Sequence, residues 1–114
     1  MSFVSEKRLR AVDMANLTRI NDQRAELNGE LLFDSVTPLL SSGRDLMAAS
    51  GGEWCVDMAG VSRASSVGVA LLLDWIRYAS QTGVDIRIKA MPDLLKPIIN
   101  VSDLDELFEP LLVH

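Results

Sequence analysis

The chain has 114 residues, enough for one domain with its own hydrophobic core. Its formal net charge of -5 disfavours nucleic acid as a partner, because that affinity comes from Lys and Arg neutralising phosphates. The same charge disfavours direct docking on an anionic membrane surface. The only histidine is His114, so neither a metal site nor a histidine-based catalytic triad is expected. The single Cys55 cannot form an internal disulfide and is interpreted as a small core residue.

The sequence shows no targeting segment. Residues 1–10 are too charged for a secretory signal, and the longest apolar run, residues 67–73, is too short to span a membrane. We therefore expect a cytoplasmic chain, for which any association with a membrane would have to be through a partner.

The first elements expected are two short strands. Residues 1–16 show no clear period and are interpreted as an N-terminal arm or an extra edge strand, ahead of a single domain over residues 17–114. Residues 17–20 and 24–28 have strand character, and the pair Asn21-Asp22 between them favours a turn.

A first helix is expected to begin at Asp34 or Ser35 as its cap, with Pro38 tolerated in or just beyond the first turn. Gly43 is an unfavourable interior residue that costs a helix about 1 kcal/mol. Residues 50–52 should end the helix. Its apolar stripe at helical spacing comprises Val36, Leu39, Leu40, Leu46 and Met47.

A strand and a helix follow, joined by a corner. Residues 53–58 have the apolar character of a strand that is covered on both faces, and Ala59-Gly60 favours a turn after it. Ser65 and Ser66 stand where the N-cap of the next helix should be. That helix is expected over residues 66–81, with Gly83 as its stop.

The last third of the chain predicts a strand and further helix. Residues 84–90 alternate, with Val84, Ile86 and Ile88 on one face, which suits an edge strand buried on one side. Residues 91–93 open another helix, and residues 102–108 form a short closing segment. The resulting order, β-β-α-β-α-β-α, predicts an α/β domain with helices packed on a mixed sheet.

The helix over residues 66–81 is more apolar than packing on one sheet requires. Its apolar arc is roughly 240° wide, whereas one sheet needs little more than 100°. Either neighbouring helices cover the surplus, or one flank binds a protein, and Trp75 and Tyr78 would suit such an interface. The remaining narrow strip is mostly polar and comprises Ser66, Ala70, Asp74, Arg77 and Gln81.

Residues 56–73 comprise a strand with Asp57-Met58-Ala59-Gly60-Val61 and then Ser66-Val67-Gly68 before an apolar helix. This run resembles the signature of the STAS domain family. The similarity extends over roughly residues 24–112. Two positions depart from the family pattern, because Ser65 stands where it has Asp and Val67 where it has a small residue. Within the family, Val61-Ser62-Arg63 and the Leu-rich helix are most similar to the STAS subunits of phospholipid ABC transporters.

The resemblance implies a non-catalytic domain without a cofactor that binds an ATPase subunit and supports it allosterically. Ser66 can act as a helix cap, as a fixed contact residue or as a phosphoacceptor, as in anti-anti-sigma factors. A hydrolase nucleophile at Ser66 is rejected, since no base or Gly-x-Ser-x-Gly elbow accompanies it. The alternatives left open are an anti-anti-sigma factor phosphorylated at Ser66 and a domain that binds a small ligand or lipid. The expected partner-binding residues are Ser62, Arg63, Ser65, Ser66, Val67, Ala70, Leu73, Asp74 and Arg77.

Overall fold

The computed structural model describes residues 15–113, which form one five-stranded mixed sheet with helices packed on it. The strand order is β1-β2-β3-β4-β5. Strand β1 (Asn16–Asn21) pairs antiparallel with β2 (Arg24–Leu31) across the turn expected at residues 21–22. Strands β3 (Glu53–Ala64), β4 (Asp85–Lys89) and β5 (Leu112–Val113) continue the sheet in parallel. The predicted α/β class is confirmed.

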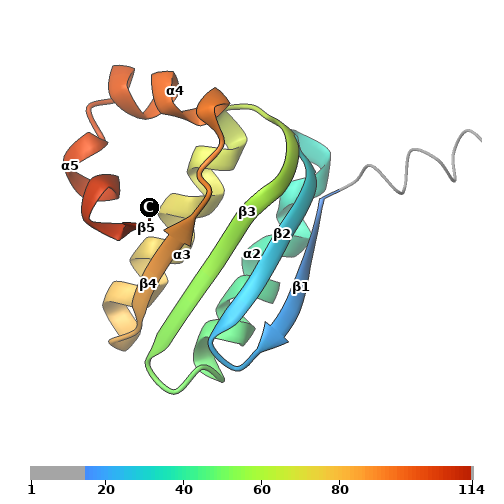
Figure 1. Ribbon diagram of the computed structural model, residues 1–114, viewed down its shortest axis with the longest axis vertical. Coiled ribbons are helices and arrows are strands. Elements are labelled where there is room, and N and C mark those ends of the chain that lie inside the picture. The colour runs from blue at the N-terminus through green and yellow to red at the C-terminus, as the bar shows by residue number, and fades with distance from the viewer. Residues whose placement is uncertain (1–14, 114) are drawn as a thin grey trace, which may run out of the picture.

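Helices α2 (Phe33–Ala48) and α3 (Ser66–Thr82) lie on the same face of this sheet (Figure 1). Each links one parallel strand to the next, and both crossovers step in the same direction along the sheet. Because such crossovers share one hand, both helices must pack on one face. The core lies between them and the sheet, and its largest fully buried side chains include Trp54, Trp75, Phe108 and Leu27.

The other face of the sheet is not covered by α2 or α3. Along β3 the buried residues Trp54, Val56 and Met58 alternate with Cys55 and Asp57, which remain partly exposed. The prediction that this strand is covered on both faces is therefore wrong. Strand β4 has the alternation that was predicted, with Ile86 and Ile88 buried and its polar residues exposed.

Strand β3 also runs further than predicted. The expected turn at Ala59-Gly60 is instead part of the strand, which continues to Ala64. The pairing of β2 with β3 shifts register twice, between Glu26 and Asn28 and between Gly29 and Glu30. Such irregularities bend a strand without ending it. Gly60 allows the close approach at the first shift, because a Cβ there would lie 1.7 Å from Oδ1 of Asn28.

Helix α2 begins earlier than predicted. Its N-cap is Leu32, and neither Asp34 nor Ser35 occupies the cap position. Ser35 still satisfies a free backbone donor at this end, because its hydroxyl accepts a hydrogen bond from the N–H of Leu32 at 3.0 Å. Pro38 lies inside the helix, beyond the first turn.

The chain after β4 is more segmented than expected. A 3-10 turn η1 (Asp93–Leu95) precedes the short helix α4 (Lys96–Val101), and α5 (Asp105–Phe108) follows. A second 3-10 turn, η2 (Glu109–Leu111), leads into β5, which pairs with the end of β4. Strand β4 is therefore not the outermost strand, although only two of its residues have β5 partners. The predicted arm falls mainly on residues 1–14, outside the described part, and Asn16 already belongs to β1.

Candidate functional site

The corner between β3 and α3 is held by Ser65. Its backbone is extended, with φ -117° and ψ -174°, and its hydroxyl accepts a hydrogen bond from the N–H of Val67 at 3.3 Å. The N–H of Ser65 donates to the carbonyl oxygen of Leu31 at 3.2 Å, which attaches the corner to the end of β2. Ser65 is therefore the N-cap of α3 and not a free side chain.

Ser66 is the first residue of α3 and is exposed. The structure shows no hydrogen bond from its hydroxyl to any described residue, so the capping role considered for Ser66 belongs to Ser65 instead. The first N–H groups of a helix lack intrahelical partners and give this end a partial positive charge. Ser66 thus presents a free hydroxyl group beside a helix N-terminus.

Two further predicted site residues, Ser62 and Arg63, are exposed on the final part of β3. Nη1 of Arg63 lies 3.4 Å from Oε2 of Glu30 on the neighbouring strand. The Arg63 side chain is 69% exposed, so this is a weak surface contact that leaves the guanidinium available to a partner.

The exposed side of α3 continues from the corner along the helix. Ser66, Ala70 and Arg77 are exposed and Leu73 is half-buried, at the spacing of one helix face. Beside this face, a groove of about 420 Å³ runs between α3 and α2. Its lining residues are Val36, Leu40, Val67, Ala70, Leu71, Leu73, Asp74 and Arg77. Five of the nine predicted partner-binding residues therefore share one groove.

An ion pair joins the two helices that form the groove. The guanidinium of Arg44 donates two hydrogen bonds to the carboxylate of Asp74, one of them from Nε at 3.0 Å. Hydrogen bonding to Asp74 raises the pKa of Arg44 above its ordinary value, so the guanidinium keeps its positive charge. The same guanidinium lies 5.9 Å from the ring centroid of Tyr78. The Asp74 carboxylate is therefore already hydrogen-bonded within the domain, and it orients Arg44 beside the groove.

The predicted aromatic flank of α3 is not an exposed interface. Trp75 is fully buried against α2, and its Nε1 donates to the carbonyl oxygen of Leu40 at 3.3 Å. Tyr78 is half-buried under Arg44. Neighbouring elements thus cover this part of the surplus apolar arc.

Val36, Leu40 and Arg44 were not predicted as site residues. The apolar stripe of α2 identified Val36 and Leu40 as core residues, but no sequence signal shows that they border a groove. Residues 15–113 contain no cluster of three or more His, Cys, Asp or Glu side chains that could hold a metal ion. Among the helices described, none is long and apolar enough to cross a membrane.

The five-stranded mixed sheet, the two helices on one of its faces and the corner at the start of α3 are the features of a STAS domain. A family model described as "Mlab, STAS domain" matches residues 11–113, and the chain belongs to this family. The resemblance drawn from the sequence is therefore confirmed. A search of curated proteins found no match.

Solved structures of several proteins share the fold. An anti-sigma factor antagonist from Mycobacterium paratuberculosis has 18% identity and a TM-score of 0.65, covering 87% of this chain and 83% of its own. The phosphorylated form of the Bacillus cell fate determinant SpoIIAA has 16% identity and a TM-score of 0.63, covering 87% and 88%. A sulfate transporter family protein from Wolinella succinogenes has 15% identity and a TM-score of 0.59, covering 85% and 80%.

Proposed function

We propose that this protein is a non-catalytic STAS subunit, similar to MlaB, that binds the ATPase subunit of an ABC transporter for phospholipids. The partner would be an MlaF-like ATPase, and the protein would contact the membrane permease only indirectly. In this role it supports the lipid asymmetry of the outer membrane from the cytoplasmic side of the inner membrane.

The observation that carries the proposal is the continuous surface made by the corner and the groove. Ser62, Arg63 and Ser66 are exposed at one end, and the α2–α3 groove with its apolar lining follows along α3. An apolar groove bordered by Arg77 and by the Arg44–Asp74 pair resembles the mixed surface of a protein interface, with apolar contacts inside a polar rim. The match to the MlaB family model supports the choice of partner.

The proposed mechanism is allosteric. A non-catalytic subunit can favour the competent state of an ATPase only by binding that conformation more tightly than the others. The α2–α3 pair, with Trp75 buried between the helices and hydrogen-bonded to Leu40, provides a surface for such selection.

Co-purification with the cognate ATPase tests the docking surface. Ser66→Glu and Arg63→Glu should abolish co-purification, because each puts a negative charge on the corner. Ser66→Glu should leave the fold intact, since a carboxylate suits a helix N-terminus. Lys89→Glu on β4, an exposed position away from the corner, is the matched control and should co-purify normally. Folded corner variants that still bind would show that the ATPase docks elsewhere.

The free hydroxyl of Ser66 favours a second candidate, a phosphorylation-regulated anti-anti-sigma factor. A phosphate on Ser66 would lie beside the unpaired N–H groups of α3, which favour anions, and would add about two negative charges to a docked interface. Ser65 replaces the family's usual Asp, which weakens this reading. Intact-mass measurement across growth conditions should show no phosphate, and a recurrent adduct mapped to Ser66 would favour the second candidate.

The proposal also includes that the protein has no catalytic activity of its own. Purified alone, it should hydrolyse neither ATP nor esters. Reproducible turnover that is lost in Ser66→Ala would contradict this.

A further inference from the structure

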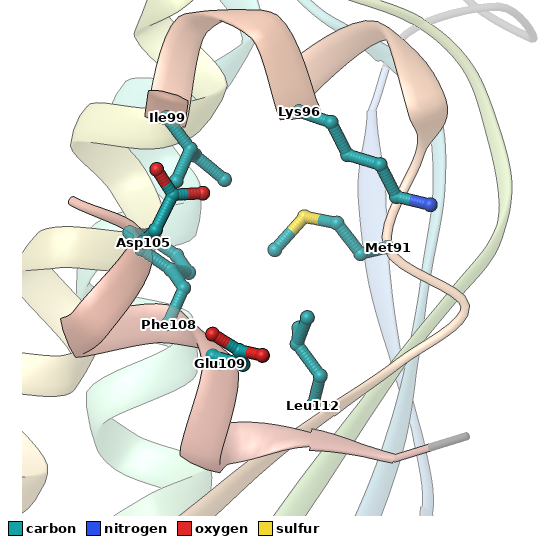
Figure 2. Close-up of a pocket in the computed structure, with 7 residues that line it drawn as sticks. All are labelled: Met91, Lys96, Ile99, Asp105, Phe108, Glu109 and Leu112. Carbon is teal, nitrogen blue, oxygen red and sulfur yellow. The ribbon is translucent and has the colours of Figure 1, made fainter. Parts of the chain in front are cut away.

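The segment after β4 encloses a cavity that no part of the proposed docking surface uses. The chain leaves β4 at Met91, passes through α4 and α5, and returns as β5 to pair with β4 (Figure 1). Figure 2 shows the residues that line the cavity inside this loop of chain. The cavity has a volume of about 280 Å³. It shares no lining residue with the α2–α3 groove.

The floor of the cavity is apolar. Ile99 and Phe108 are 4% and 1% exposed, and their side chains are part of the core. Met91 and Leu112 are half-buried and complete the floor from the two strand ends. Methionine adapts its shape readily, so this surface can adjust to an apolar chain.

The charges at the cavity are mainly negative. In Figure 2 the carboxylates of Asp105 and Glu109 border the opening, whereas the ammonium group of Lys96 points away from it. Nζ of Lys96 is instead 2.8 Å from Oδ1 of Asp93. Asp105 accepts one hydrogen bond, from Nδ2 of Asn100 at 3.0 Å, and the structure shows no described partner for the Glu109 carboxylate. Both carboxylates thus keep free acceptor positions.

We propose that this cavity binds a short-chain primary alkylammonium ion, with its ammonium group between Asp105 and Glu109 and its alkyl chain on Met91, Ile99 and Leu112. An ammonium group has three donors and no acceptor, and ionised carboxylates accept only, so the two are complementary. An anion would be repelled by the same carboxylates. A hydrated metal ion would gain nothing from the apolar floor, whereas an alkyl chain gains from every methylene it buries.

Titration of the full chain with n-hexylammonium chloride at pH 7 tests this site, with the methyl resonances of Met91 and Leu112 as the readout. Both should shift, and affinity should rise by about fourfold for each methylene from propyl- to pentylammonium. Hexanoate and 1-hexanol, which match the chain but lack the cation, should bind at least tenfold more weakly. Equal binding of 1-hexanol would overturn the proposal, because the carboxylates would then play no part.

The double variant Asp105→Asn/Glu109→Gln should lower the hexylammonium affinity about tenfold or more, since each ionic hydrogen bond becomes neutral. Glu106→Gln is the control, because it neutralises one carboxylate on α5 outside this cavity and should leave the affinity unchanged. Unchanged affinity in the double variant would overturn the site. A lysine tripeptide with an acetylated N-terminus and an amidated C-terminus should bind more weakly than the free amines. Tighter binding of this peptide would overturn the proposal and would assign the cavity to a lysine side chain of a partner protein.

Discussion

Ser65 and Ser66 are neighbours with the same side chain, but the fold gives them different roles. Ser65 adopts an extended backbone and uses its hydroxyl to cap α3, whereas Ser66 begins the helix and leaves its hydroxyl free. The difference follows from the backbone, which is extended at Ser65 and becomes helical at Ser66. It separates the residue that stabilises the corner from the residue that can contact a partner.

Replacement of each serine by alanine should therefore have different effects on stability. Ser65→Ala should lower the free energy of unfolding by about 1 kcal/mol through loss of the cap. Ser66→Ala should change it by less than about 0.5 kcal/mol, as for an ordinary surface residue. Urea denaturation of both variants measures this. An equal or larger loss for Ser66→Ala would mean that the capping assignment is wrong.

Cys55 faces the open side of the sheet and is partly exposed. Burial raises the pKa of its thiol above the ordinary value of 9.0, and the nearby positive charge of Arg24 opposes the shift. The folded chain therefore keeps this proton to a higher pH than the unfolded chain does.

Two measurements follow from this pKa shift. At pH 8 the folded chain should react with iodoacetamide more slowly than the urea-unfolded chain, because it holds less thiolate. Above pH 9 the thiol ionises first in the unfolded chain. The free energy of unfolding should therefore fall as the pH rises toward the pKa that Cys55 has in the folded chain. The Cys55→Ser variant should lack this component of the pH dependence. Faster alkylation of the folded chain would contradict the direction of the shift.

At the scale of elements, the packing of α2 on α3 depends on Gly43. The indole ring of Trp75 occupies the space that a side chain at Gly43 would need, since a Cβ there would lie 2.2 Å from Cε2 of the ring. The glycine that weakens α2 by propensity therefore permits the close contact between the two helices. This contact also buries Trp75 and prevents it from acting as an interface anchor.

Gly43→Ala should consequently destabilise the protein by about 1–3 kcal/mol through overpacking, although alanine is the better helix former. Ser41→Ala, at an exposed position on the same helix, is the control and should be close to neutral. Thermal unfolding and tryptophan fluorescence would measure the effect. A gain in stability for Gly43→Ala would show that the Trp75 ring moves aside without cost.

At the scale of the whole molecule, the sheet, both long helices and the C-terminal segment share one core. Trp54 and Trp75 meet within it edge to face, with ring centroids 5.4 Å apart. Leu95, Ile99 and Phe108 connect the C-terminal segment to the same cluster. The prediction that residues 17–114 form a single domain can be tested by unfolding.

A single domain should unfold in one transition, so that tryptophan fluorescence and far-UV circular dichroism change together. Phe108→Ala should lower the free energy of unfolding by about 3–5 kcal/mol for both probes, because it removes a fully buried ring. Leu107→Ala, whose side chain is 43% exposed, should cost much less. A circular dichroism change that precedes the fluorescence change would show that the C-terminal segment unfolds separately.

Hydropathy and turn residues by themselves determined the element order of this protein through β4. The spacing of apolar residues identified α2 and α3. The alternation of residues 84–90 predicted the strand buried on one face that the structure places at residues 85–89. Gly83, with φ 75°, ended α3 as predicted. These features are local, because each depends on neighbouring residues in the chain. The family resemblance was likewise visible in a continuous run of residues.

Only the tertiary structure decided features that depend on residues far apart in sequence. Strand β3 passes Gly60 because its irregular pairing with β2 allows it, and that register involves residues 24–31. Trp75 is buried because Gly43 in another helix leaves room for it. The α2–α3 groove and the cavity enclosed after β4 arise where separate elements meet. Local propensity carries no information about such contacts, because it does not specify which surfaces the fold brings together.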